Sequence, residues 1–163
     1  MMSVKLYSDG SARGNPDGPG GYGTILKYID KKGELHTREY SKGFIKTTNN
    51  RMELRGVIAG FEALKFPCRV EVFSDSKYVI DAFNSGWIDN WQKNNWRKSD
   101  KKPVLNVDLW KRLLKVMDGH SVTFTWVKGH DGHPENEKCD ELAVNAALSE
   151  NLYEDDIVNE EDI

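Results

Sequence analysis

The sequence predicts a single-domain α/β protein built on a five-stranded mixed sheet. Three strand-like segments follow one another near the start, residues 4–7, 22–29 and 35–44, and loops without helical pattern join them. Consecutive strands of this kind form an antiparallel meander. Two later strands, 69–74 and 121–127, each follow a helix and should therefore run parallel to the first strand. At 163 residues the chain is long enough for one core.

Helices are predicted where apolar residues recur every three or four positions. One helix starts at Asn50 and ends before Pro67, and two more cover residues 77–84 and 107–117. A last helix runs from about Pro134, which suits a first helical turn, to residue 149. A Trp-rich segment, residues 87–102, lies between the second and third helices.

Composition and charge narrow the class of protein. The chain is 38% hydrophobic and 30% charged, as in ordinary globular domains. No apolar run approaches the roughly 18 residues of a membrane span, and residues 1–5 lack a signal-peptide core. We therefore expect a cytoplasmic protein without a membrane partner. The two cysteines, Cys68 and Cys139, match no zinc spacing and are expected to be reduced.

The charges divide the chain into two parts. Residues 150–163 hold seven acids and no Lys or Arg, whereas residues 1–149 carry a net charge of +4. We predict a catalytic domain over 1–149 and a flexible, solvated acidic tail over 150–163. A basic body is compatible with a polyanionic partner, and the tail would then compete for the same surface. Deleting residues 150–163 should in that case strengthen binding at low salt.

Four carboxylates lie where an apolar segment ends or a helix begins: Asp9, Glu53, Asp75 and Asp140. In an open α/β sheet, ligands bind outside the carboxyl ends of the strands, so acids at two strand ends can be neighbours. At about 4 Å and an effective dielectric of about 20, two such charges repel by roughly 4 kcal/mol. A cluster of this kind needs a cation, and oxygen ligands favour Mg²⁺ or Mn²⁺ over zinc.

Taken one at a time, the acids have structural alternatives. Asp9 before Gly10 could be a turn former, and Asp75 could cap the following helix. Glu53 could be the reciprocal partner of Asn50 in a capping-box-like arrangement. Asp140 fits a structural role less well, since it lies beside an apolar helical stripe where a lone carboxylate is partly desolvated.

Eight segments, in order along the chain, carry a resemblance to a known family. They are SDGS (8–11), GNP (14–16), GGYG (20–23), TTNNRMEL (47–54), SDS (74–76), WIDNW (87–91), WVKGH (126–130) and HPENEKCD (133–140). Together they resemble bacterial type I ribonuclease H from residue 4 to residue 148. The resemblance implies the ribonuclease H-like fold, with helices on both faces of the sheet.

The resemblance also implies an endonuclease that hydrolyses the RNA strand of RNA–DNA hybrids. Asp9, Glu53, Asp75 and Asp140 would hold two Mg²⁺ ions, which Mn²⁺ can replace. Two metals about 3.5–4 Å apart activate the attacking water and stabilise the leaving 3′-oxygen. Products would carry 5′-phosphate and 3′-hydroxyl ends. A loop histidine alone is more often a bystander, but the resemblance implies that His130 assists proton transfer or product release.

Recognition of a hybrid depends on 2′-hydroxyls in the shallow minor groove, so sequence specificity should be low. By resemblance, Asn15, Asn49 and Asn50 line that groove, while Thr48 and Lys77 bind near phosphates. The Trp-rich segment resembles the family's basic protrusion, which grips the DNA strand. Its predicted contacts are Trp87, Trp91, Lys93, Arg97, Lys98, Lys101 and Lys102. The alternative for the tryptophans is a core-packing pair beneath a solvated basic face.

Two other functions fit parts of the pattern. A hybrid-binding module without catalysis would lack some of the acids, all of which are present here. An integrase-like relative would cut duplex DNA, but the segments around Thr48 and Trp87 weigh against it. We therefore predict a monomeric, hybrid-specific ribonuclease H.

Overall fold

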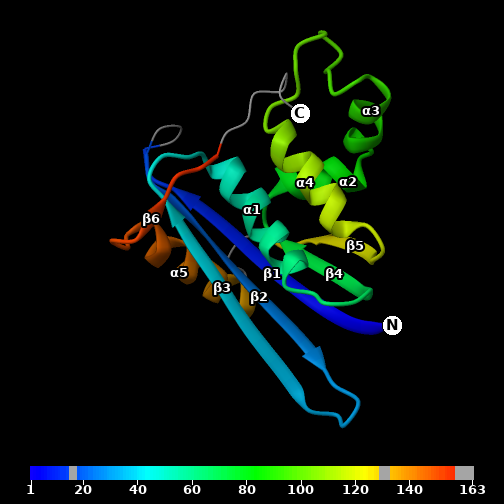
Figure 1. Ribbon diagram of the computed structural model, residues 1–163, viewed down its shortest axis with the longest axis vertical. Helices are drawn as coiled ribbons and strands as arrows, with labels where there is room; N and C mark the ends of the chain where they lie inside the picture. The colour runs from blue at the N-terminus through cyan, green and yellow to red at the C-terminus, as the bar shows by residue number, and fades with distance from the viewer. Residues whose placement is uncertain (15–17, 129–132, 157–163) are drawn as a thin grey trace.

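The computed structural model describes residues 1–14, 18–128 and 133–156, which build a mixed sheet with helices on both faces (Figure 1). In this part of the chain the sheet has the strand order β5-β4-β1-β2-β3-β6. The strands are β1 Met2–Ala12, β2 Gly20–Ile29, β3 Leu35–Phe44, β4 Cys68–Ser74, β5 Ser121–Trp126 and β6 Leu152–Tyr153. The helices are α1 Asn49–Glu62, α2 Lys77–Asn84, α3 Trp87–Lys93, α4 Val107–Met117 and α5 Pro134–Ala147.

The strand directions confirm the predicted mixed sheet. β1 pairs antiparallel with β2, and β2 pairs antiparallel with β3. β4 then lies on the other side of β1 and runs parallel to it, and β5 runs parallel to β4. Because β1 and β4 are parallel neighbours, their carboxyl ends lie at the same edge of the sheet. Asp9 and Asp75 come from those two ends.

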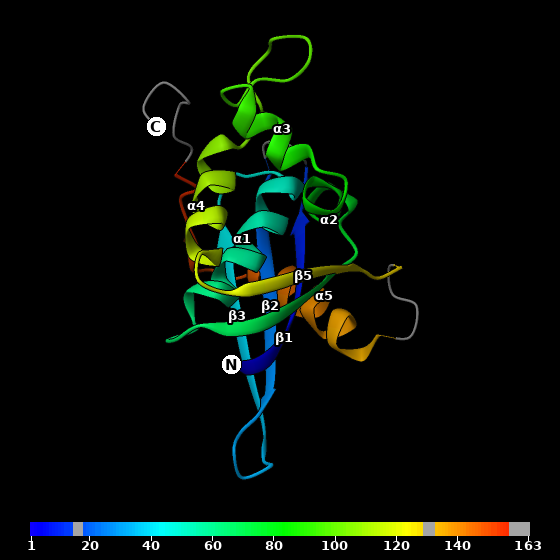
Figure 2. The ribbon, with the colours of Figure 1, turned by 90° about the vertical axis from the view of Figure 1, so that its right-hand side faces the viewer.

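The helices cover the two faces unequally (Figure 2). α1, α2 and α4 lie on one face over the larger core, which includes the fully buried Leu6, Phe61 and Trp110. Of the helices in the described residues, α5 is the one that covers part of the other face, where Ile25 and Cys139 belong to a smaller cluster. The predicted ribonuclease H-like layering, with helices on both faces, is confirmed.

Close approach of helix to sheet depends on glycine at two positions. A Cβ on Gly10 of β1 would lie 2.5 Å from the backbone nitrogen of Glu53, so α1 packs directly on the strand backbone. On the opposite face, a Cβ on Gly23 of β2 would collide with the carbonyl oxygen of Cys139 in α5. Since Gly23 pairs with Asp9, both helices approach the sheet next to the predicted metal-binding acids.

The first strand is longer than the sequence pattern predicted. β1 continues through Ala12, because residues 9–12 keep their pairing with residues 20–23 of β2. Asp9 therefore lies within a strand, and its reading as a turn former was wrong. Gly10, which suggested a turn, instead allows the close contact of this strand with α1.

The acidic segment after α5 also differs from the prediction. Leu152 and Tyr153 add a sixth strand, β6, parallel to the end of β3, so the predicted count of five strands was wrong by this short edge strand. The aromatic ring of Tyr153 lies near that of Phe44, and the Lys42 ammonium lies over the Tyr153 ring. Beyond β6 the side chain of Asp155 is completely buried. Leu152, Tyr153 and Asp155 are therefore attached to the rest of the domain, whereas Glu150, Glu154 and Asp156 are exposed, and the division of the chain at 149/150 stays a prediction.

The Trp-rich segment projects from the end of the molecule that carries α3 (Figure 1). Only residues 87–93 of it are helical, and an irregular loop with positive φ at Asn95, Trp96 and Lys101 leads from there towards α4. Within the described ranges, the helices are too short or too polar to cross a membrane.

Candidate active site

Three carboxylates converge at the shared edge of β1 and β4. Each of Asp9, Glu53 and Asp75 has one carboxylate oxygen that lies within 4.8 Å of the corresponding oxygens of the other two. Asp9 comes from β1, Asp75 follows β4, and Glu53 reaches the same point from α1. The backbone N–H of Gly10 donates to Asp9 Oδ1 at 2.9 Å and to Glu53 Oε1 at 3.0 Å. This arrangement matches the ligand cluster predicted from the sequence for these three acids.

Glu53 and Asp75 do not have the helix-capping roles that were their structural alternatives. Thr48 is the N-cap of α1, and its hydroxyl accepts from the Arg51 N–H at 3.2 Å. Ser76 is the N-cap of α2, and its hydroxyl accepts from the Val79 N–H at 3.3 Å. Because hydroxyl residues cap both helices, the carboxylates are turned to the cluster instead.

The electrostatics of the cluster favour a bound cation. Burial, reinforced by the charge of Asp75, raises the pKa of Asp9 to about 7, and Asp140 contributes in the same direction. Burial and the charges of Asp9 and Asp75 likewise raise the pKa of Glu53. Glu53 Oε2 is buried without a hydrogen-bond partner among the described residues. A buried, unpaired carboxylate oxygen beside two like charges suits a divalent metal ligand, so the residues fit such an ion.

Asp140 lies on α5 and is half-buried. It is not among the three acids whose oxygens meet within 4.8 Å, yet its charge is one of those that raise the pKa of Asp9. Its predicted role as a fourth ligand stays a prediction. Two predicted residues, His130 and Asn15, lie outside the described residues, so their roles stay predictions as well.

The predicted groove residues surround the start of α1. Asn49 and Asn50 are exposed in its first turn, and Asn49 Oδ1 accepts from the Ala12 N–H at 3.0 Å. Lys77 is exposed at the start of α2, where its ammonium lies 4.8 Å from the ring centroid of Trp126. These positions adjoin the carboxylate cluster, and the substrate contacts themselves stay predictions.

The predicted protrusion combines both readings of its tryptophans. Trp91 packs against the buried Trp110 with ring centroids 5.5 Å apart, as the core-packing alternative expected. Trp87 is 40% exposed and lies 6.2 Å from Trp91. The cationic residues of the segment are all exposed: Lys93, Arg97, Lys98, Lys101 and Lys102. The half-buried Trp91 therefore links the exposed Trp87 to the core residue Trp110.

Two residues beside the cluster were missed by sequence reasoning. Trp126 was predicted only as part of the strand over residues 121–127, but it is 43% exposed and its indole N–H donates to the Asp75 carbonyl at 3.2 Å. Asn136 is buried at the start of α5, close to the Phe73 carbonyl of β4, and its Oδ1 has no partner among the described residues. A buried asparagine leaves no periodic signal, whereas Trp126 belongs to the WVKGH segment.

A second group of potential ligands lies in the turn between β2 and β3. Asp30, Glu34 and His36 approach one another there. Asp30 is already bonded to His36 Nε2 at 2.7 Å and to two backbone N–H groups of the turn. These bonds account for the group as a turn motif.

Comparison with known proteins is consistent with this geometry. The family model described as RNase H matches residues 1–148. The chain belongs to the ribonuclease H family. It is 61% identical to the ribonuclease H of Lachnoclostridium phytofermentans over 157 residues, which cover 96% of this chain and 99% of that protein. It is 51% identical to a ribonuclease H of Escherichia coli O127:H6, over 93% and 94% of the two chains.

Among solved structures, this ribonuclease H resembles LC9-RNase H1, which is described as a type 1 RNase H with the type 2 active-site motif. The TM-score is 0.81 at 35% sequence identity, and the match covers 91% of this chain and 73% of that one. The predictions of the family, of the fold and of ribonuclease H activity towards RNA–DNA hybrids are confirmed at the level of the family. The carboxylate cluster is consistent with a metal site.

Proposed function

We propose that this ribonuclease H is a metal-dependent endonuclease that cuts the RNA strand of RNA–DNA hybrids with little sequence specificity, leaving 5′-phosphate and 3′-hydroxyl ends. The single observation that carries the proposal is the cluster of Asp9, Glu53 and Asp75. One carboxylate oxygen from each lies within 4.8 Å of the others, and Glu53 Oε2 is buried without a hydrogen-bond partner in the described part of the chain. Neutral hydrogen-bonding groups would be expected there if the cluster served only the fold.

The residues that would hold the metal are these three acids and Asp140. Two divalent ions, Mg²⁺ or Mn²⁺, would supply an activated water and stabilise the leaving 3′-oxygen. The protein's own part is to fix the ligands: the Gly10 N–H holds carboxylates from β1 and α1 in one orientation. His130 would carry a proton to or from the reacting oxygens.

Binding of the hybrid would use two surfaces. Asn15, Asn49 and Asn50 would donate to and accept from sugar and base edges in the minor groove, since amides can do both. Thr48 and Lys77 would lie near phosphates. The exposed Trp87 and the cationic side chains of the protrusion would contact the DNA strand, where stacking and phosphate contacts are independent of sequence.

The test compares three substrates with a labelled strand: an RNA–DNA hybrid, duplex RNA and duplex DNA. Wild-type protein should shorten only the RNA of the hybrid, and only with Mg²⁺ or Mn²⁺ present. Asp75→Asn should abolish cleavage, while Asp118→Asn, at an exposed acid after α4, should leave it unchanged. Hybrid bound but never shortened by wild type would favour a binding module, and cleavage of duplex DNA would favour integrase-like chemistry.

The chemistry of the product ends and the oligomeric state can be measured separately. End-labelling of the products distinguishes 5′-phosphate from 5′-hydroxyl ends. The predicted monomeric state can be measured by sedimentation, and it stays a prediction, as does the cytoplasmic location.

A further inference from the structure

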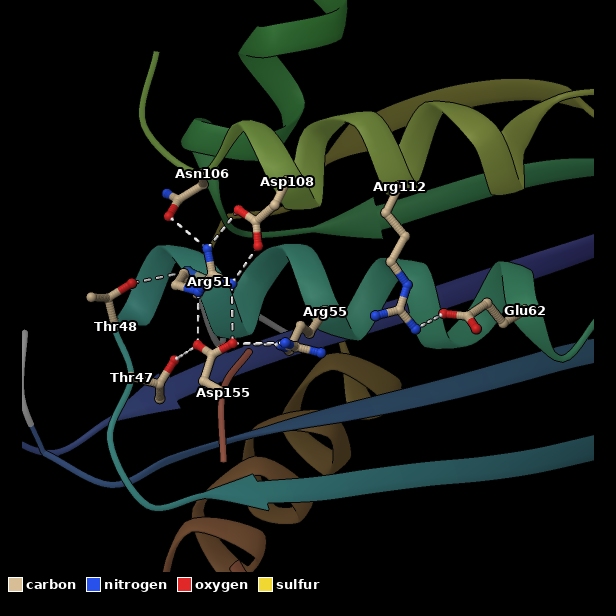
Figure 3. A network of polar contacts seen from close by, with 9 residues as sticks. All are labelled: Thr47, Thr48, Arg51, Arg55, Glu62, Asn106, Asp108, Arg112 and Asp155. Carbon is tan, nitrogen blue, oxygen red and sulfur yellow. Dashed lines mark hydrogen bonds and ion pairs between the residues drawn. The ribbon is translucent and has the colours of Figure 1, made fainter. Parts of the chain in front are cut away.

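Arg51 is a buried cation that joins three separate segments of the chain (Figure 3). Its side chain is 3% exposed, although it lies in the first turns of a helix at the edge of the core. Nε donates to Asp155 Oδ2 at 2.7 Å, and Nη2 donates to Asp155 Oδ1 at 3.1 Å and to Asp108 Oδ2 at 2.8 Å. Nη1 donates to Asp108 Oδ1 at 3.0 Å and Asn106 Oδ1 at 3.2 Å. All five N–H groups of the guanidinium are therefore used.

Asp155 is the matching buried anion. Its carboxylate is completely buried and, besides the two bonds from Arg51, accepts two from Arg55 at 2.7 and 3.1 Å. The Thr47 hydroxyl donates to Asp155 Oδ2 at 2.5 Å. Burial alone would raise the pKa of Asp155, but these hydrogen bonds outweigh it and hold the pKa below the usual value. The charge is therefore kept, and the segment that carries it is held in place by β6.

The net stability of the fold does not by itself explain this network. Well-packed apolar residues can replace a buried ion pair without loss of stability. Hydrogen-bonded charges, by contrast, can fix the relative positions of the elements that carry them. The bonds of Arg51 join α1 both to the start of α4 and to the segment that follows β6. The role of the network therefore depends on which segments of the chain it joins.

Two of the three joined segments adjoin parts of the proposed substrate site. Thr47 and Arg51 flank Thr48, Asn49 and Asn50, and Arg51 is two positions before Glu53. Asn106 and Asp108 begin α4, at the point where the basic protrusion returns to the core.

The root of the protrusion is itself fixed in position. Asn106 has a φ of 62°, in the left-handed region, and its side-chain amide donates to the Tyr78 hydroxyl at 3.0 Å. Trp110 donates to the same hydroxyl at 3.2 Å. Arg51 therefore links the first turn of α1 to a rigid anchor of the protrusion, and Asp155 holds Arg51 from the opposite side.

We propose that Asp155 is a positioning residue for the hybrid: by clamping Arg51 it sets the first turn of α1 in register with the basic protrusion, so that the two strands of one hybrid are engaged together. This inference rests on the proposed function. Asp155 itself is bound by Arg51 and Arg55 and so is not available to compete for the protrusion, unlike the role expected for the acidic segment as a whole. Removing it should weaken hybrid binding rather than strengthen it.

The test is a double-mutant cycle on hybrid cleavage, measured with Mg²⁺ at a temperature below every unfolding transition. One arm is Asp155→Asn, and the other is the combined Lys98, Lys101 and Lys102→Ala variant. If Asp155 aligns the protrusion, the lysine substitutions should raise KM in the wild-type background and much less in the Asp155→Asn background. We expect a coupling of about five-fold or more in kcat/KM, within the range for interacting sites. Equal effects in both backgrounds, which a purely structural role predicts, would overturn the proposal.

A substrate-length series gives a second readout. The hybrid is shortened until the lysine variant and wild type cleave it equally, so that the protrusion no longer contributes. On that short hybrid Asp155→Asn should match wild type within about two-fold, whereas on a long hybrid its KM should be clearly higher. An equal loss on both lengths would contradict a positioning role. Asp155→Glu, which keeps the charge, should restore part of the difference.

The matched control is the exposed ion pair between the same two helices. Arg112 Nη2 lies 2.6 Å from Glu62 Oε1, and both side chains are more than 40% exposed (Figure 3). Glu62→Gln should show no coupling to the lysine variant. If Asp155→Asn fails to fold, Asp108→Asn removes the other carboxylate on Arg51 and serves in the same cycle. Failure of wild type to cleave the hybrid would refute the proposed function, whereas cleavage with additive effects would refute only this inference.

Discussion

Replacement of Gly10 by alanine tests how the carboxylate cluster is built. The added Cβ would lie 2.5 Å from the backbone nitrogen of Glu53 and 2.6 Å from the carbonyl carbon of Met52. Both are helix backbone atoms, which cannot turn aside as a side chain would. Ordinary contact needs about 3.5 Å, so α1 must move from β1 by roughly 1 Å. The movement would also lengthen the bond from the Gly10 N–H to Glu53 Oε1.

The cost should fall in the upper part of the range for overpacked cores, about 2–3 kcal/mol in the free energy of unfolding. For a domain of this size the melting temperature should then fall by roughly 4–12 °C. Hybrid cleavage should fall as well, because the carboxylates of Asp9 and Glu53 would no longer meet in the same geometry. Thermal unfolding followed by circular dichroism and initial cleavage rates measure the two effects.

Gly56→Ala is the matched control for this experiment. Gly56 lies on the same helix and faces the same strands, but its added Cβ would be 3.4 Å from the nearest atoms, at ordinary contact distance. Alanine favours a helix over glycine by up to about 1 kcal/mol, so this variant should be as stable as wild type or more stable. If both variants melted and cleaved like wild type, the argument that Gly10 sets the distance between α1 and β1 would fail.

Three further predictions concern charge. Burial and the charge of Asp75 raise the pKa of Asp9 to about 7. The stability of the metal-free protein should therefore decrease as pH rises from about 4 to 7. Asp75→Asn should raise the melting temperature at pH 8 but much less at pH 5. An equal gain at both pH values would contradict this. Asp155→Asn should lower the free energy of unfolding by roughly 3–5 kcal/mol at pH 7. Because the pKa of Asp155 is held below the usual value, urea titrations should show this difference shrinking as pH falls below about 3.9, and a constant difference would argue against a charged Asp155. Loss of the three protrusion lysines should reduce the salt dependence of hybrid affinity by about 0.7–0.9 in slope per lost phosphate contact, and an unchanged slope would remove their role.

The sequence was sufficient for the sheet and for most of the carboxylate cluster. Alternation and turns identify the strands because side chains on a half-buried sheet must alternate between core and solvent. The acids stood out since each interrupts an apolar pattern, and Asp9, Glu53 and Asp75 do meet. The length of β1 was underestimated because Gly10 resembles a turn residue, although its lack of a side chain serves the contact with α1.

The C-terminal segment could not be predicted by the same reasoning. A run of acids has the composition of a disordered tail, and composition does not show that one of those acids matches a buried guanidinium. Arg51 lies in a polar helix start, and its partners are 57 and 104 residues away in the chain. Long-range charge pairing of this kind leaves no local pattern in the sequence.

The distance of 104 residues between Arg51 and Asp155 has a consequence for biosynthesis. At roughly 5–20 residues per second, a ribosome makes Asp155 about 5–20 s after Arg51. During that interval the nascent polypeptide holds a cation whose final counter-ion does not yet exist, so the helix that carries it would stay open to water or rest against Asp108 alone. Products truncated before Asp155 would lack the buried counter-ion that Arg51 has in the folded protein.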